Sequence, residues 1–494
     1  MRVFRFVTEL YAKPEATLMN LEAVTDALLD AEADLNLLER TIDGVHYWER
    51  VRFGIHRELR QELGLIGQPH TKSERSKLVT LGNALRSLVV ESPFLAPSDD
   101  VLVYGHSRRK QLDDGLWWDI YCDPIVEALE ADCTRMELPH EGKHLAPART
   151  DDLRHLDFVK TAPGIARRVT PRNWPLSTAE VDELERIADR FEAETGVRPS
   201  VVESVAGSLL ARRVRVPLYR RIIRRVDPEL AVTVVGYCRE PFIEACQDCG
   251  VPVVELQHGV VSRHHMGYSY PGDRTKRTFP DYLLSFGTFW EEVVEFPLPS
   301  DRIISVGYPY LERRLAELDR PASARSGRIV FVSQGPIGEP LSEFAVEFAD
   351  RNPERDVVYK LHPGEYSRWR REYPWLEDAN LRVVGEDGPE LYDLFADASV
   401  QVGVYSTALY EGLAFDLETY VVDLQGAAYM DRLVEMGGAT LIETVEGLET
   451  ALSEPTRPGI DIEQFFRPNA VANVREALES IRERADAEPK RVTQ

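Results

Sequence analysis

Short apolar runs alternate with helical spacing along the last third of the chain. The runs lie at residues 357–361, 399–404 and 419–423. Each run ends in a polar turn, and apolar residues between the runs recur at steps of three and four. Buried parallel strands appear in a sequence as short continuous apolar runs, and their crossovers appear as helices. This alternation therefore predicts βαβ units in a parallel sheet.

The same alternation occurs in an earlier part of the chain. Apolar runs separated by polar loops and helical spacing lie at residues 101–104, 230–236, 251–256, 281–286 and 302–306. Residues 139–174 look loop-rich, and a polar stretch at 314–327 is typical of a linker. A further run begins at residue 328. Because 494 residues are too many for one hydrophobic core, we expect two α/β domains.

The first 95 residues have a different pattern. Apolar residues recur at helical steps on both sides of a segment in which Trp48, Val51, Ile55 and Leu59 would share one helix face. Such a stripe is more often core than a binding site. We therefore expect a helical extension at 1–95, a first Rossmann-like domain at 96–313 and a second at 322–486.

Charge and hydropathy narrow the function classes. The formal net charge is −24 and the sequence pI is about 5.0, which argues against general nucleic-acid binding. Basic residues are nearly all Arg, and an acidic surface poor in Lys suits a halophilic, high-salt cytoplasm; GC-rich coding bias would give the same composition. No apolar stretch approaches the ~18 residues of a membrane span, and the start lacks signal-peptide features, so we expect a cytoplasmic protein.

One basic run stands out in this acidic chain. Seven Arg residues lie between Arg212 and Arg225. They would suit a peripheral contact with an anionic membrane on its inner face, or with a polyanionic acceptor. The alternative is a helix whose Arg residues pair with the abundant carboxylates. The five Cys residues, with an isolated CxxC at 246–249, indicate neither a disulfide framework nor a zinc site.

A candidate general base follows the apolar run at 251–256. His258 stands between Gln257 and Gly259, and Gly259 allows a sharp turn or the close approach of a ligand. A His at the carboxyl end of a strand, within reach of an acceptor hydroxyl, is suited to proton transfer near neutral pH. The alternative is a His satisfied by a backbone carbonyl.

Two cationic side chains lie at the end of the run at 357–361. Lys360 and His362 are two residues apart, so on a strand they leave from the same face, and Pro363 ends the strand. Together they could hold a phosphate group and stabilise the charge that builds on a leaving phosphate. The alternative is a surface Lys and a loop His.

Hydroxyl groups follow the run at 399–404. Ser406 and Thr407 begin a helix, where hydroxyls and free amides favour an anion, although a plain N-cap Ser would look the same. Glu411 lies one helical turn further and could bind the two hydroxyls of a ribose, or be a surface charge. In the loop after residues 101–104, Arg108 and Arg109 are candidates for binding the acceptor or an anion. The alternative is that this is an ordinary solvated loop without a binding role.

The order of these motifs is more specific than any one of them. It runs QHG at 257–259, GYP at 307–309, VSQ at 332–334, KLHP at 360–363 and STALYE at 406–411. From residue 253 to residue 441 the chain resembles GT-B glycosyltransferase-like proteins of capsule and teichoic-acid synthesis. That group includes CDP-glycerol glycerophosphotransferases, capsule polysaccharide transferases and bacterial polysialyltransferases.

The resemblance implies roles for the matching residues. It makes His258 the base, with Gln257 and Gly259 in the acceptor-side element, and it assigns the donor phosphate to His362, Ser406 and Thr407 and the ribose to Glu411. One departure concerns the sialyltransferases of the group, which carry an acidic-acidic-Gly motif before HP. Here the similar string at 386–388 follows HP, so a CMP-sialic acid donor is not indicated.

We therefore predict an α/β, GT-B-like fold: two Rossmann-type parallel-sheet domains that face each other across a cleft, with an N-terminal helical extension. The expected function is transfer of a sugar from a nucleotide-activated donor to a glycan or lipid-linked acceptor of the cell envelope. We expect no cofactor and no metal, since no DxD-type motif stands out. The alternatives are a CDP-glycerol-type glycerophosphotransferase, a nucleotide-sugar 2-epimerase or a non-catalytic envelope-assembly scaffold. Homo-oligomerisation, the donor base and sugar, and the acceptor stay open.

Overall fold

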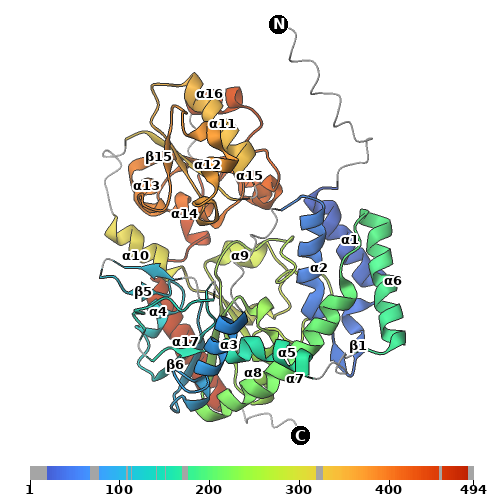
Figure 1. Ribbon diagram of the computed structural model, residues 1–494. Coiled ribbons are helices and arrows are strands. Elements are labelled where there is room, and N and C mark those ends of the chain that lie inside the picture. Colours follow the sequence, from blue (N-terminus) through green and yellow to red (C-terminus); the bar gives the residue numbers. More distant parts are fainter. Residues whose placement is uncertain are drawn as a thin grey trace.

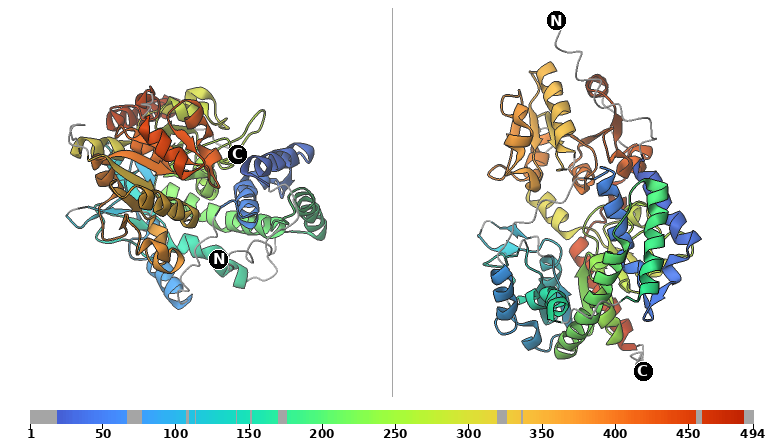
Figure 2. Two further views of the ribbon diagram at one scale, coloured as in Figure 1. Left: turned by 90° about the horizontal axis from the view of Figure 1, so that it is seen from above. Right: turned by 45° about the vertical axis from the view of Figure 1, so that its right-hand side comes forward.

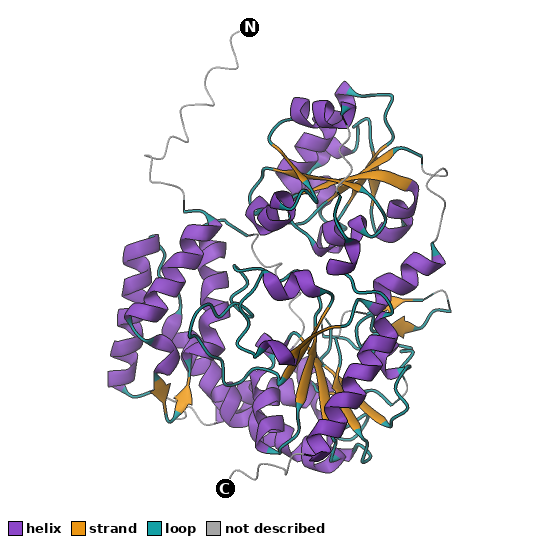
Figure 3. Ribbon diagram, turned by 180° about the vertical axis from the view of Figure 1, so that it is seen from behind, coloured by secondary structure: helices purple, strands orange, loops and turns teal. Residues whose placement is uncertain are grey.

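The computed structural model describes residues 19–66, 77–106, 109–112, 114–140, 142–150, 152–169, 176–318, 326–335, 337–454 and 459–487. It contains two parallel sheets in separate lobes (Figure 1 and Figure 3). In the described part of the chain no helix is both long enough and apolar enough to cross a bilayer.

The sheet of the first lobe has seven strands, all parallel, in the order β11-β10-β9-β8-β3-β6-β7. Its strands are β3 (Val101–Tyr104), β6 (Cys133–Glu137), β7 (Arg154–His155), β8 (Leu230–Val234), β9 (Val253–Leu256), β10 (Tyr282–Ser285) and β11 (Ile303–Ser305). Strand order reverses between β3 and β8. This is the order of a doubly wound Rossmann sheet with one additional strand.

The sheet of the second lobe has six strands, again all parallel, in the order β14-β13-β12-β15-β16-β17. They are β12 (Arg328–Val332), β13 (Val357–Lys360), β14 (Arg382–Val384), β15 (Ala398–Gly403), β16 (Glu418–Val422) and β17 (Thr440–Ile442). Numbered along the chain, the order is that of a Rossmann sheet, with the switch point between β12 and β15. The prediction of two Rossmann-type sheets is confirmed.

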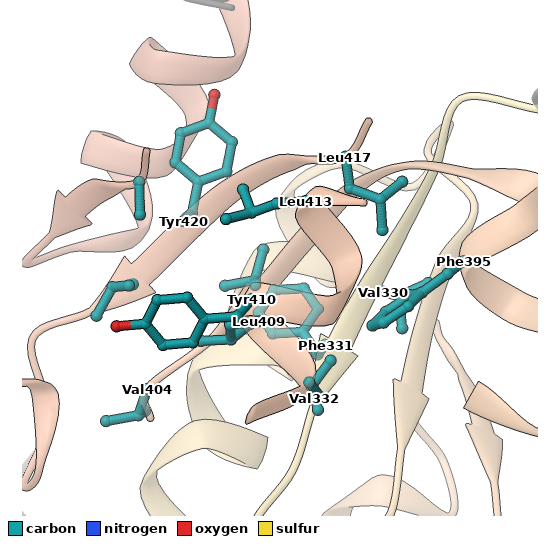
Figure 4. Close-up of a cluster of buried hydrophobic side chains, with 14 of the residues drawn as sticks. Val330, Phe331, Val332, Phe395, Val404, Leu409, Tyr410, Leu413, Leu417 and Tyr420 are labelled. Carbon is teal, nitrogen blue, oxygen red and sulfur yellow. The ribbon is translucent and has the colours of Figure 1, made fainter. Parts of the chain in front are cut away.

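The core of the second lobe explains why short β-branched and aromatic runs were visible in the sequence. Strand residues such as Val330 and Phe331 are completely buried. They pack against helices α13 (Leu391–Asp397) and α14 (Thr407–Leu413), which supply Phe395 and Leu409 (Figure 4). Both faces of the sheet are covered by helices, so its strands carry no polar face and appear as continuous apolar runs.

The N-terminal helices pack with a pair of helices from the middle of the chain. Helices α1 (Leu21–Asp34) and α2 (Trp48–Glu62) share one core with α6 (Thr178–Thr195) and the first half of α7 (Val201–Val226) (Figures 1 and 2). The predicted stripe on α2 lies in this core, where Trp48, Val51, Ile55 and Leu59 are all buried. Sequence patterns did not indicate the partnership with α6 and α7.

The same helices hold the long loop that follows His258. Arg52 on α2 is completely buried, and its guanidinium donates to the carbonyl oxygens of Met266 at 2.7 Å and Ser269 at 2.8 Å. The Glu32 carboxylate on α1 balances the charge, with Oε1 2.6 Å from Arg52 Nε. A buried charge is stable only when it is paired and hydrogen bonded, so this contact fixes the loop on the helices.

Three features of the first lobe differ from the expectations. The short strand β5 (Trp117–Trp118) pairs antiparallel with β4 (Lys110–Gln111) outside the large parallel sheet. The region 139–174 contains β7 and helix α5 (Asp157–Val169) in place of a continuous loop. Strand β6 was missed because it has the mixed sequence CTRME.

The C-terminal helix α17 (Ala470–Ala487) returns to the first lobe. Its Val474, Leu478 and Ile481 pack on strands β3 and β8 together with helix α4 (Asp123–Val126). Helices α7 and α8 (Glu240–Asp248) cover the opposite face. The sheet of the first lobe is thus completed by a segment that follows the second lobe in sequence (Figure 1).

The returning segment lies against two glycines of the first lobe, Gly287 and Gly307. A Cβ on Gly287 would lie 2.2 Å from the backbone oxygen of Gln464, and Gly287 has extended backbone angles that any residue can adopt. Gly287→Ala should therefore displace this segment and lower the free energy of unfolding by about 2 kcal/mol or more in denaturant titration. Gly54→Ala, on α2 with open space around its Cβ, should leave stability equal or slightly higher. Equal stability of both variants would contradict this account of the docking.

Candidate functional site

The two lobes meet where the turn after β9 approaches the start of α14. The Val260 amide donates to Thr407 Oγ1 at 3.1 Å. A Cβ on Gly259 would lie 3.2 Å from the same oxygen, so a larger residue would press against the second lobe. We call this contact the interlobe seam. It brings the predicted acceptor-side element, which contains His258, next to the predicted phosphate-binding element that begins at Ser406.

His258 lies half-buried on the first-lobe side of the seam. Its carbonyl oxygen accepts from the Tyr121 hydroxyl at 2.9 Å, and its Nδ1 lies 3.4 Å from the Tyr268 hydroxyl. Burial, followed by the positive fields of His265, His106 and Arg239, lowers the pKa of His258 to about 3. The imidazole is therefore neutral at physiological pH, which is the protonation state a base requires.

The neighbours of His258 in the QHG motif serve the turn itself. The Gln257 side chain is buried; its Nε2 donates to the Gly259 carbonyl at 2.9 Å, and its Oε1 accepts from the Phe286 amide at 2.8 Å. Both ends of the amide are thus committed to the backbone. Gln257 shapes the turn that carries His258, and Gly259 permits the close approach at the seam.

His362 follows β13 and has one defined tautomer when neutral. Its Nδ1 accepts from the Gly364 amide at 3.1 Å, so the ring proton of the neutral form is on Nε2. The His362 amide donates to Glu365 Oε2 at 2.7 Å, and Glu365 Oε1 accepts from the Ser333 hydroxyl at 3.1 Å. Ser333, in the VSQ motif, and Glu365 brace the HP turn; sequence patterns did not reveal either role.

Lys360 is engaged within the second lobe. Its Nζ donates to the carbonyl oxygens of Gly385 at 3.2 Å and Pro389 at 3.1 Å. Burial lowers the pKa of Lys360. The positive charge of Lys110 also lowers it, whereas the negative charge of Glu390 opposes the shift. The ammonium group therefore anchors the loop between β14 and α13.

Ser406 and Glu411 both have partners. Ser406 Oγ accepts from the Ala408 amide at 3.2 Å, which is the ordinary N-cap contact. The Glu411 carboxylate hydrogen bonds to Tyr392; after burial it is a leading cause of the raised pKa of Tyr392, and it also raises that of Tyr308. Tyr308 belongs to the GYP motif, so Glu411 lies where that motif meets the second lobe.

The predicted anion-binding loop of the first lobe differs from the expectation. Arg108 lies outside the described residues. Arg109 is buried, and its guanidinium forms ion pairs with Glu137 at 3.0 Å and Asp123 at 3.4 Å. These contacts fit a structural Arg inside the first lobe. A second cation of this loop, Lys110, reaches the other lobe and pairs with Glu390 at 2.6 Å.

The Arg-rich run forms the second half of α7. Arg212 pairs with Glu244 at 2.5 Å and Arg213 with Asp43 at 3.4 Å, so the run is partly neutralised by carboxylates. The Arg221 guanidinium lies 5.7 Å from the centre of the Phe94 ring. Arg220 also pairs with Asp248, whereas Arg221, Arg224 and Arg225 are exposed, so the run contains both paired and solvent-facing Arg residues.

A cluster of metal-ligand type lies away from the seam. Glu137, His144 and His155 each place one ligand atom within 4.8 Å of the others. Both nitrogens of His144 are already bound to carboxylates, Nδ1 to Glu137 and Nε2 to Asp157, each at 2.7 Å. The imidazole rings of His144 and His155 are stacked, with their centres 3.4 Å apart and an angle of 4° between their planes. Two His ligands of one metal ion would instead each direct a ring nitrogen toward the ion. The arrangement fits a protonated His144 held between two carboxylates.

This interpretation predicts a pH dependence of stability. Burial alone would lower the pKa of His144, but the hydrogen bonds from Asp157 and Glu137 outweigh it and raise the value from 6.5 to about 9. The stabilisation is therefore complete below about pH 6.5 and is lost as the pH rises through 9. The melting temperature of the wild type should fall toward that of His144→Gln over this window. A constant difference between the two proteins would show that His144 is not protonated.

Comparisons with known proteins found similar solved structures at low sequence identity. No protein-family model and no curated protein matches the chain. One similar solved structure is UDP-GlcNAc 2-epimerase of Methanocaldococcus jannaschii in complex with UDP-GlcNAc and UDP; the sequence identity is 10%, the TM-score is 0.42, and the match covers 77% of this chain and 98% of that one. A second is a variant of the wall teichoic acid polymerase TagF, with 11% identity, a TM-score of 0.41 and coverage of 84% of this chain and 99% of that one. A third is MurG of Acinetobacter baumannii, with 12% identity, a TM-score of 0.42 and coverage of 78% of this chain and 100% of that one. The two Rossmann-type lobes and the N-terminal helices of this chain themselves define its fold as α/β and GT-B-like.

Proposed function

We propose that the protein transfers a sugar from a nucleotide-activated donor to a glycan or lipid-linked acceptor. The observation that carries this proposal is the interlobe seam, which joins the QHG turn to the carboxyl end of β15 through Val260 and Thr407. In an open parallel sheet, ligands bind at the carboxyl ends of the strands that flank the switch point. Thr407 follows one of these strands, β15, and His362 follows β13, the neighbour of β12.

His258 is the proposed base. The acceptor O–H bond breaks, and its proton bonds to the imidazole while the acceptor oxygen forms a bond to the anomeric carbon of the sugar. The bond from that carbon to the donor phosphate breaks, and its electron pair leaves with the phosphate. A pKa of about 3 makes His258 a weak base in the free protein. A bound anionic donor would raise the pKa toward the working pH, because a nearby negative charge stabilises the imidazolium.

The donor phosphate would be held by His362 and Thr407, with Ser406 beside them. His362 offers an Nε2–H donor because its Nδ1 is occupied by the Gly364 amide. Thr407 would exchange its contact with Val260 for the phosphate, so donor binding and movement at the seam are linked. Lys360 contributes its field, and Glu411 would bind ribose hydroxyls in place of the Tyr392 hydroxyl. No metal or cofactor enters this proposal.

A nucleotide-sugar 2-epimerase is the second candidate. Two buried carboxylates of the first lobe favour it, because acid–base chemistry at carbon needs such groups. Asp119 is 1% exposed and Glu255 is completely buried, and burial is the main cause of the raised pKa of each. The backbone amides of His106 and Tyr121 already bind Asp119, at 2.7 and 3.0 Å, which suits a structural role equally well.

A membrane-bound acceptor is favoured by one surface. Leu85, Val89 and Leu95, on α3 (Lys77–Arg86) and in the turn after it, are 57%, 74% and 62% exposed. Arg221 of α7 lies against Phe94 in the turn that carries Leu95, so one cationic group lies beside these apolar side chains. Exposed apolar residues beside Arg residues suit the interface of an anionic bilayer. We call these residues the α3 surface.

The central test is release of nucleotide from UDP-, CDP-, GDP- and CMP-linked sugars and from CDP-glycerol, with and without acceptor. A sugar transferase releases nucleotide from a sugar donor only when a suitable acceptor is present. His362→Ala should lower the turnover about tenfold or more, because it removes a phosphate donor, while the melting temperature stays near the wild-type value.

The matched control is His46→Ala, since His46 Nδ1 contacts the Leu38 carbonyl at 3.1 Å and lies in the N-terminal helical region. Equal losses of activity and stability in His362→Ala would identify a structural His. Conversion of the sugar donor without acceptor would favour the epimerase. Turnover of CDP-glycerol but of none of the sugar donors would favour a glycerophosphotransferase. Absence of turnover with all donors would leave the scaffold alternative.

The α3 surface predicts binding to anionic vesicles. Co-sedimentation with phosphatidylcholine vesicles that contain phosphatidylglycerol should fall severalfold in the double variant Leu85→Glu/Val89→Glu, because two charges enter the apolar face. Leu441→Glu changes an exposed Leu of the second lobe and should bind as the wild type does. Equal binding by all three proteins, or absence of binding by the wild type, would contradict a membrane role for this surface.

A further inference from the structure

Glu255 is a buried acid directly behind the proposed base. It lies on β9 and is completely buried. Its Oε1 accepts from the Tyr268 hydroxyl at 2.5 Å and from the Gly236 amide at 2.8 Å, whereas its Oε2 has no partner within the described structure. Burial of a carboxylate is unfavourable unless its charge has a use or a full set of partners. Glu255 therefore needs an explanation beyond packing.

The turn that contacts Glu255 is built around it. Val235 has φ 61° and ψ 51°, a left-handed conformation that is strained for a β-branched residue. It directs the following amide toward Glu255 Oε1. A Cβ on Gly236 would lie 2.4 Å from Glu255 Oε2, so only glycine leaves room for the carboxylate. Backbone strain and a required glycine both serve the placement of this one acid.

Tyr268 connects Glu255 to His258. Its hydroxyl lies 2.5 Å from Glu255 Oε1 and 3.4 Å from His258 Nδ1. A tyrosine has one hydroxyl proton, and an ionised carboxylate can only accept. Even a proton on Oε2 would leave Oε1 as the acceptor of the short contact. The Tyr268 proton is thus committed to Glu255, and the Tyr268 oxygen can only accept from His258.

We propose that Glu255 and Tyr268 are positioning residues that hold His258 in its Nδ1–H tautomer, so that Nε2 is the nitrogen that takes the acceptor proton. The identification of the acceptor hydroxyl as the proton donor rests on the proposed function, whereas the tautomer assigned to His258 does not. The sequence of hydrogen bonds is His258 Nδ1–H to Tyr268 Oη, and Tyr268 Oη–H to Glu255 Oε1. The distance of 3.4 Å is long, as is usual for such contacts before substrate binds, and it should shorten when the ring becomes cationic.

This arrangement has a clear effect on proton transfer. When Nε2 gains a proton, the imidazolium acquires a positive charge inside the lobe. The neighbouring His106, His265 and Arg239 oppose that charge. The Glu255 carboxylate is the negative group connected to the ring, and it stabilises the imidazolium through Tyr268 without contact with substrate.

The first test requires no substrate. Long-range proton–nitrogen NMR spectra of the protein labelled at histidine distinguish the two tautomers, and a His258→Gln variant assigns the resonances. We expect the Nδ1–H form in the wild type and a large fraction of the Nε2–H form in Tyr268→Phe, which keeps the ring and removes the hydroxyl. An Nε2–H tautomer in the wild type, or an unchanged tautomer in Tyr268→Phe, overturns the proposal whether or not any activity has been found.

The second test uses turnover. Tyr268→Phe and Glu255→Gln should each lower kcat about tenfold or more and leave the KM for donor nearly unchanged, because they weaken the base and not donor binding. Tyr219→Phe is the matched control: Tyr219 is buried in the same lobe and its hydroxyl lies 3.3 Å from that of Tyr104. An equal loss of kcat in the control, or wild-type kcat in Glu255→Gln, overturns the role assigned to Glu255.

Discussion

The close approach of the two lobes at Gly259 is the constraint on which the candidate site depends. A Cβ at Gly259 would lie 3.2 Å from Thr407 Oγ1, so a side chain there would push the QHG turn away from Thr407, and the Val260 amide has its acceptor in the other lobe. Each lobe alone is an ordinary Rossmann sheet. The contact joins the turn that contains His258 to the start of α14 in the other lobe. A site that binds two substrates between the lobes would need residues from both.

The positions of most strands could be predicted because strands buried on both faces appear in the sequence as short apolar runs. Strands β9, β12 and β15 are covered on both faces, so most of their residues are apolar, with buried exceptions such as Glu255 and Gln401. Strand β6 lies nearer the edge of its sheet and carries Thr134 and Arg135 among its five residues, so it has no such trace. The partnership of α2 with α6 depends on contacts between distant segments, which periodicity cannot reveal.

The sequence allowed the candidate residues to be chosen by their chemical type and their position after strands, but it did not reveal which groups they contact. The turn that carries His258 lies against Thr407 through Gly259 and Val260, and the Nδ1 of His362 accepts from the Gly364 amide. Arg109 and Lys360 looked like free cations, yet a buried guanidinium needs carboxylates and a buried ammonium needs carbonyls, and each has found them. The buried acid and tyrosine behind His258 were not predicted, because a Glu within an apolar strand gives no sign of what it faces.

The chain passes between the lobes twice, once after α10 (Pro309–Glu317) and again where it returns into α17. A domain attached by a single connection can swivel in any direction, whereas one attached at two points can rotate mainly about the line that joins them. Because the returning segment is fixed at Gly287 and the helix is packed under β3, one end of that line is anchored in the core of the first lobe. Any opening of the molecule is thereby limited to a hinge motion with a set axis, which would bring the same two faces back together on every closure.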